Sequence, residues 1–363
     1  MSDLTNTFTD IANAIRAKTE TTITYKPTEM ANAINNISSE SGMILEGTSA
    51  SIIRQFNLPV TISNNVITMY GCFSGCYNFN QPVTIPNSVT NITRCFSECN
   101  NFNQPVIIPN SVTSIAECFG SCRNFNQPVI IPNSVTSMNS CFSGCYNFNQ
   151  PITIPNSVTS MSSCFSGCNN FNQPITIPNS VTSITECFSG CRNFNQPITI
   201  PNSVIYISGC FANCHNFNQS ITISNNVTSM SRCFSDCSNF NQPVTIPDKV
   251  TNMFNCFAYC TNFNQPVTIP DKVTSIFNCF YYCPQFGQTV KIACNSSLNV
   301  KNMFKSGNNS KVKTIITNNV TPFLGTSMTN SIVGAAITWT QSGSNYYNAT
   351  YNIYVNYSAN PLA

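Results

Sequence analysis

The pattern of apolar and polar positions repeats every 23 residues through most of the chain. One block begins at Cys72 with the letters Cys-Phe-Ser-Gly-Cys-Tyr-Asn-Phe-Asn-Gln-Pro-Val-Thr-Ile-Pro. It restarts at Cys95, Cys118, Cys141, Cys164, Cys187, Cys210, Cys233, Cys256 and Cys279. A unit this short cannot bury a core alone, so it must stack on its neighbours. The sequence therefore predicts a repeat solenoid.

Each unit contains a short alternating segment bounded by prolines. In the first unit, Val83 and Ile85 alternate with Thr84, which predicts a strand with Thr84 facing outward. Because proline cannot donate to a ladder, Pro82 and Pro86 confine pairing to the residues between them. The predicted fold is mainly β, a parallel solenoid.

The fixed phenylalanines of the repeat should stack through the core. We expect Phe148 to lie buried between Phe125 and Phe171, its equivalents one coil away on either side.

Three regions follow from the pattern. Residues 1–42 show apolar positions at helical spacing and then a polar linker, which predicts a small helical hairpin. Residues 43–325 form the solenoid, with degenerate repeats at both ends as capping requires. Residues 326–363 predict two strands around a turn. Two strands are not stable alone, so they must pack on the solenoid or on another copy of the chain.

Charge and hydropathy exclude some partners. Only 7% of residues are charged and the net charge is +3, which argues against nucleic-acid binding because that requires clustered Lys and Arg. No stretch approaches the ~20 apolar residues of a membrane helix, so no membrane insertion is expected. The N-terminus has no basic region followed by an apolar run, so we expect no secretion signal.

Cysteine is the most unusual component, since 20 of the 21 cysteines occupy the two Cys positions of the repeat. The Cys-x3-Cys spacing differs from that of zinc knuckles, and the chain has one histidine. The pattern favours two rows of buried thiols that act as small hydrophobes. A disulfide array and a metal array are the alternatives.

Polar groups of the kind that carry catalysis fall at positions that vary between repeats. His215, Glu98, Glu117, Glu186 and Asp236 are of this kind, and a solvated surface position is the simpler interpretation of each. There is no nucleophile–base set and no phosphate loop. We therefore expect no catalytic residue, no metal, no cofactor and no enzymatic activity.

The last two full units differ from the others by becoming aromatic at variable positions. The residues concerned are Phe254, Tyr259, Phe277, Tyr281 and Tyr282. Exposed aromatic rows add contact area to binding surfaces, so these five are the candidate binding residues. Alternatively, the C-terminal region or another subunit covers them.

The repeat resembles the BspA-type leucine-rich repeat. The letters Ile-Pro-Asn-Ser-Val-Thr-Ser-Met at 131–138 and Cys-Phe-Ser-Gly-Cys at 141–145 carry the likeness, with Cys141 where that family usually has alanine. The Asn-Phe-Asn-Gln-Pro run at 147–151 is similar to related surface-protein repeats. The resemblance implies a leucine-rich-repeat-like solenoid and a role in surface adhesion or interaction, and it supplies no catalytic residues.

The N-terminus resembles a segment at the start of many bacteriophage tail and accessory virion proteins. The stretches at 10–19 and 26–34 carry the likeness, with Glu20 in place of the usual glycine. The resemblance implies docking to other virion proteins through the helical apolar face, which comprises Phe8, Ile11, Ile15, Met30 and Ile34.

Three functions remain open. The first is a virion protein of tail, baseplate or fibre that assembles in the host cytoplasm, forms a homo-oligomer and attaches to a host-surface glycan or protein. The second is an architectural head fibre or baseplate spacer. The third is a cellular surface adhesin of the BspA type.

Overall fold

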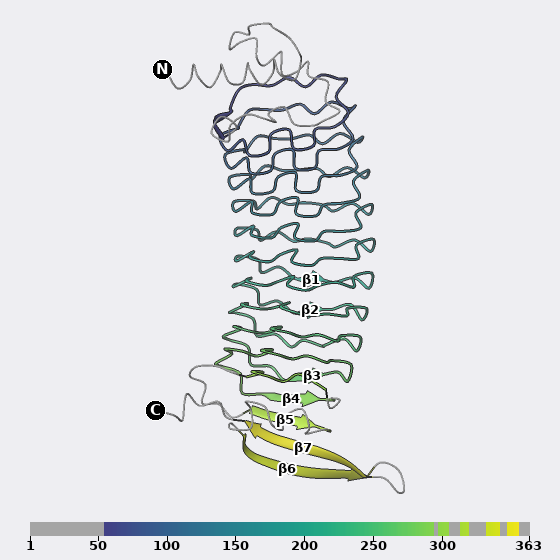
Figure 1. Cartoon of the computed structure of the whole chain (residues 1–363), viewed down its shortest axis with the longest axis vertical. Helices are drawn as coiled ribbons and strands as arrows, with labels where there is room; N and C mark the ends of the chain where they lie inside the picture. Colours follow the sequence, from purple (N-terminus) through teal and green to yellow (C-terminus); the bar gives the residue numbers. More distant parts are fainter. Residues whose placement is uncertain (1–53, 294–296, 305–312, 319–331, 342–346, 356–363) are drawn as a thin grey trace. The chain divides into compact units, whose positions relative to one another are not determined.

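The computed structural model describes residues 54–293, 297–304, 313–318, 332–341 and 347–355. The helical hairpin expected within residues 1–42 lies outside these ranges. The chain divides into two compact units, Met1–Ser180 and Val181–Ala363. In each unit, successive 23-residue coils stack on one another (Figure 1). Within the described ranges, no helix has the length and apolarity needed to cross a membrane.

The fixed apolar positions of the repeat form the core of each unit. Phe148 is 0% exposed, and its ring centroid lies 6.1 Å from that of Phe125 and 6.0 Å from that of Phe171. A second phenylalanine of the same coil, Phe142, stacks 4.5 Å from Phe148. The predicted burial and stacking of Phe148 are therefore confirmed, and the coil registration with them.

The proline-bounded segment has the predicted orientation. Val83 and Ile85 are both 6% exposed, whereas Thr84 is exposed. We call this side of the coils the strand face. Regular strands on it are short, for example β1 (Ile198–Thr199) and β2 (Ile221–Thr222), which pair in parallel.

In the first unit, the described residues pair between coils through isolated bridges such as Thr68 with Asn91, and not through regular strands. The prolines on both sides of each segment remove the donors that a longer ladder would need.

The most regular backbone ladder lies where no strand was expected, in the turn around the two cysteines. Phe96 N–H donates to the carbonyl of Cys118 at 2.8 Å, and Arg94 N–H donates to that of Ala116 at 2.9 Å. The intervening Cys95 N–H donates back to the carbonyl of Ile92 at 3.1 Å. Successive amides thus donate hydrogen bonds alternately to the next coil and to their own coil, so the buried backbone N–H groups have acceptors.

A larger sheet forms in the second unit at its C-terminal end. β3 (Val267–Ile269), β4 (Thr289–Ile292) and β5 (Lys313–Thr317) pair in parallel. β7 (Tyr347–Val355) pairs antiparallel with β5, and β6 (Ile332–Gln341) pairs antiparallel with β7. The order is β3-β4-β5-β7-β6 (Figure 1). The two C-terminal strands thus extend the strand-face sheet of this unit.

Candidate binding surface

The segment equivalent to residues 70–77 forms a turn in every full coil, and we call its exposed side the turn face. Two positions of this turn have a left-handed backbone, for example Arg94 with φ 58° and Glu98 with φ 63°. The side chains here vary between coils, whereas the core and the strand face scarcely change. A surface that varies on a constant scaffold is where a repeat protein carries specificity.

Charged side chains concentrate on the turn face and pair between neighbouring coils. Arg94 Nε lies 2.8 Å from Glu117 Oε2. The hydroxyl of Tyr77 donates to Glu98 Oε2 at 3.3 Å. These two glutamates therefore have partners, which differs from the simply solvated surface expected from the sequence.

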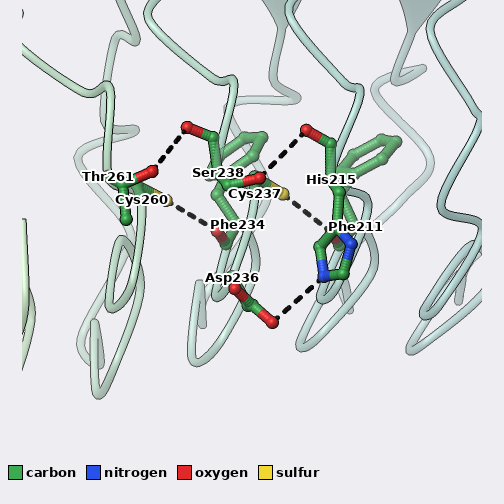
Figure 2. A network of polar contacts seen from close by, with 8 residues as sticks. All are labelled: Phe211, His215, Phe234, Asp236, Cys237, Ser238, Cys260 and Thr261. Carbon is green, nitrogen blue, oxygen red and sulfur yellow. Dashed lines mark hydrogen bonds and ion pairs between the residues drawn. The ribbon is translucent and has the colours of Figure 1, made fainter.

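His215 and Asp236 form a further pair between coils. His215 Nε2 lies 3.2 Å from Asp236 Oδ2, and both side chains are partly exposed (Figure 2). Next to them, Thr261 Oγ1 donates to the carbonyl of Ser238 at 3.1 Å, and Ser238 Oγ donates to that of His215 at 3.4 Å. The contacts join consecutive coils and include no nucleophile set against a base, so they hold the turns together.

Below the turn face lie the paired cysteines of the repeat, Cys72 to Cys283, which are buried. Cys237 Sγ donates to the carbonyl of Phe211 at 2.9 Å, and Cys260 Sγ donates to that of Phe234 at 2.9 Å (Figure 2). These cysteines are free, and a sulfur at this distance from a carbonyl oxygen fits a thiol donor. Burial raises the pKa of Cys72 to about 12, and the pKa of Cys237 well above its ordinary value. Such thiols are chemically inert.

The candidate tyrosines come together at the C-terminal coils. The ring of Tyr259 meets that of Tyr281 edge-on with centroids 5.3 Å apart, and it lies 5.7 Å from the ring of Tyr282. Tyr259 and Tyr282 remain 44% and 45% exposed with the described strands β5 to β7 in place. Partial burial and then the neighbouring Tyr281 raise the pKa of Tyr259 above its ordinary value.

The candidate phenylalanines form a second group at the start of the same turns. Phe254 and Phe277 stack with centroids 5.5 Å apart and are half-buried. The guanidinium of Arg232 lies 5.6 Å from the Phe254 centroid, within range of a cation–π contact. All five candidate residues therefore lie on the turn face in two groups. Whether they bind a partner stays a prediction.

Arg232 was not among the residues predicted from the sequence. Arg232 lies 22 residues before Phe254, so the 23-residue repeat places the two residues on neighbouring coils. The cation–π contact itself could not be predicted, because it depends on the geometry of the turn. The left-handed backbone of Tyr259 and Tyr282, with φ 61° and 55°, was also not foreseen. Glycine at the equivalent positions Gly144 and Gly167 was the available signal.

The strand face of the first unit offers a second surface. A shallow groove of about 830 Å³ is lined by residues such as Pro151, Thr153 and Pro174. In neighbouring coils, Ile107 and Ile130 are 84% and 86% exposed. The lining residues are those that scarcely change between coils, so this face is less specialised than the turn face.

The repeat matches a known protein family over most of its length. The family model described as "Mycoplasma protein of unknown function, DUF285" matches residues 49–153, 108–199, 131–223, 182–291 and 207–319. The chain belongs to this family. The DUF285 match begins at residue 49, so residues 10–34 lie outside it, and their expected relation to virion proteins stays a prediction. No curated protein matches the sequence.

A solved structure places this DUF285 protein among leucine-rich-repeat folds. A leucine-rich repeat protein from Bacteroides ovatus ATCC 8483 is 21% identical, with a TM-score of 0.50, and the match covers 67% of this chain and 69% of that chain. A leucine rich cell surface protein from Faecalibacterium prausnitzii A2-165 is 22% identical, with a TM-score of 0.39, and the match covers 70% of this chain and 85% of that chain. The first likeness confirms the leucine-rich-repeat-like solenoid predicted from the sequence.

Proposed function

We propose that this protein is a non-enzymatic surface-binding solenoid of the BspA type, which holds a host-surface glycan or protein against its turn face. The observation that carries the proposal is the pair Tyr259 and Tyr282, which combine exposure with a left-handed backbone. The turn imposes the left-handed backbone in other coils too, so the exposed aromatic rings are what distinguish these two positions, and a role in binding accounts for them.

The left-handed backbone has a cost at these positions. For residues other than glycine, this conformation costs roughly 1–2 kcal/mol, whereas glycine adopts it freely. Gly144, Gly167 and Gly190 occupy the equivalent position in earlier coils. Non-glycine residues such as Glu98 and Ser121 also take the left-handed backbone at this position. Stacking therefore works without an aromatic residue there, and two exposed tyrosine rings are best explained by a contact outside the chain.

The composition of the surface supports binding to a macromolecule. Tyrosine and arginine are the residue types that most often dominate binding energy at interfaces. Tyr259, Tyr282 and Arg232 lie on consecutive coils, so one partner could contact all of them. Rigid coils on both sides would hold these side chains in place, which lowers the entropy lost on binding.

Thiols do not argue against display at a surface. Reduced cysteines are unusual in an oxidising compartment. Here burial raises the pKa of the Cys145 thiol well above the ordinary value of a cysteine. Little thiolate therefore forms, and oxidation is slow. The cysteine rows are therefore compatible with an extracellular location.

Binding of the fluorescent full-length chain to intact host cells, measured by flow cytometry, tests the proposal. The double variant Tyr259→Ser/Tyr282→Ser should keep the fold, because Ser121 occupies the same left-handed position with φ 61°. We expect its binding to fall at least tenfold, the loss typical of interface anchors.

Tyr206→Ser is the matched control. Tyr206 is 53% exposed and its equivalent one coil later is Ser229, so the change removes a tyrosine of similar exposure elsewhere. Binding of this variant should equal that of the wild type. Unchanged binding by the Tyr259→Ser/Tyr282→Ser variant would contradict the proposal.

A second candidate function is a bacteriophage virion component, and the resemblance of residues 10–34 to virion proteins favours it. In that case the face of Phe8, Ile11, Ile15, Met30 and Ile34 docks to the particle, and the turn face still contacts the host. Mass spectrometry of purified particles, with and without deletion of residues 1–37, distinguishes the two. A virion component is present in the particles and is lost on deletion, whereas a cellular surface protein is absent from them.

A further inference from the structure

The strand β6 ends the C-terminal sheet on one side. It pairs antiparallel with β7 from Ile332 to Gln341, and β7 is its one neighbour among the described strands. In an antiparallel sheet, alternate residues of an edge strand direct their N–H and C=O groups away from the partner. With respect to the described strands, the outer side of β6 therefore presents an unpaired row of backbone donors and acceptors.

This edge lacks the features that usually prevent pairing between chains. Proteins protect edge strands with lysine, proline, short length or bulges. β6 is 10 residues long and reads Ile-Val-Gly-Ala-Ala-Ile-Thr-Trp-Thr-Gln, without charge or proline. Its register shift lies at the start, between Ile332 and Gly334, and leaves the rest of the strand regular.

The other strands of this unit differ in this respect. β4 contains Lys291, β5 begins at Lys313, and β1 and β2 have two residues each. β7 is also uncharged, but β5 and β6 pair with it on both sides. Among the described strands, β6 is thus the long, uncharged strand that lies at a sheet edge.

We infer that β6 pairs with β6 of a second copy of this chain, antiparallel across a two-fold axis, so that the two C-terminal sheets become one. Two identical strands related by such an axis are antiparallel to each other, so each outward N–H of one copy can donate to an outward C=O of the other, and every contact of residue i with residue j is repeated as j with i. An uncharged strand opposes no like charge when it meets itself.

Head-to-tail stacking is a poorer fit to the same edge. A solenoid coil pairs with the next through its strand face, as β1 with β2 shows, and through its turn, as the bonds of Phe96 and Arg94 to the following coil show. β6 supplies a strand but no turn, so a coil of another copy would leave its turn amides without acceptors.

The dimer would carry two turn faces, so attachment to a surface with many receptors would be bivalent. Two linked sites can bind 10²–10⁴-fold more tightly than one. The pairing itself is independent of what the turn face binds, and its test uses no receptor.

Light scattering coupled to size-exclusion chromatography of the full chain tests the inference. We expect a mass near 39.8 kDa at low concentration and twice that value at high concentration. Hydrogen exchange in a β6 peptide should slow as the dimer forms, whereas exchange in a β4 peptide should not change. A single-chain mass throughout, a series of larger species, or a dimer without slowed exchange in β6 would each overturn the inference.

Two adjacent proline variants locate the pairing edge. Ala335 and Ala336 direct their amides to opposite sides of β6, because neighbouring residues alternate in a strand. One of Ala335→Pro and Ala336→Pro should therefore abolish the dimer while exchange in β7 stays slow. If both variants still dimerise as the wild type does, the interface is not at β6.

Discussion

Asn149 donates its backbone N–H to the side-chain oxygen Oδ1 of Asn126, one coil earlier, at 2.9 Å. The same oxygen accepts a hydrogen bond from Gln150 Nε2 at 3.2 Å. The arrangement recurs in other coils, for example at Asn80 and Asn103. One side-chain oxygen thus satisfies an amide that has no strand partner, which explains the constant Asn-Gln pair of the repeat.

Replacing Asn126 should reveal the contribution of this bond. Asn126→Ala removes the acceptor of a partly buried amide, which typically costs about 1–3 kcal/mol in the free energy of unfolding. Asn126→Asp keeps the oxygen and should cost less. Urea unfolding followed by circular dichroism measures both. Equal losses in the two variants would show that the acceptor is not the cause.

Truncating a core ring should destabilise more strongly. Phe148 is 0% exposed and stacks on Phe125, Phe142 and Phe171. Phe148→Ala should cost ~3–5 kcal/mol, because it leaves a cavity that the rigid coils cannot close. Phe148→Leu keeps most of the volume and should cost under about 1.5 kcal/mol. A loss below 1 kcal/mol for Phe148→Ala, on the scale of a surface change, would contradict the packing.

A glycine at a left-handed position isolates the cost of that backbone. Gly71 has φ 61°, and a Cβ added there would meet no atom within 4 Å. Gly71→Ala should therefore destabilise by roughly 1–2 kcal/mol through conformation alone. Ser74→Ala in the same turn is the control and should change stability by less than about 0.5 kcal/mol. If the two variants have equal stability, the cost assigned to Tyr259 and Tyr282 is too high.

Alkaline pH should destabilise the protein through its thiols. Burial raises the pKa of Cys72 and Cys76 from 9.0 to about 12 in the folded state, with a smaller contribution from Cys72 at Cys76. The unfolded chain then releases protons that the folded chain retains, so the free energy of unfolding falls as pH rises between about 9 and 12. Below pH 9 this contribution is fully present.

A variant with one coil free of cysteine tests whether the thiols cause this loss of stability at alkaline pH. Other groups also titrate in this range, so the decrease between pH 8 and pH 11 in the wild type should be compared with that in Cys72→Ala/Cys76→Ala. The variant should show a smaller decrease, because it lacks two of the raised thiols. An identical decrease in both proteins would assign the effect to other groups.

The sequence by itself determined the solenoid, its 23-residue coil and its core. A repeat that cannot bury its own apolar side chains has to stack, so Phe148 could be placed between Phe125 and Phe171 from spacing alone. It also singled out the five aromatic candidates, because ten near-copies reveal each position that departs from the common pattern.

Only the tertiary structure decided how the backbone is satisfied and which polar groups meet. The ladder through the turn accompanies left-handed residues such as Glu98, whose conformation the sequence signals only through the glycines at the equivalent position of other coils, such as Gly144. The pairs Arg94 with Glu117 and His215 with Asp236 need the distance between coils and the direction of each side chain. The edge position of β6 likewise depends on sheet order, because residues far apart in the chain decide which strand has one neighbour.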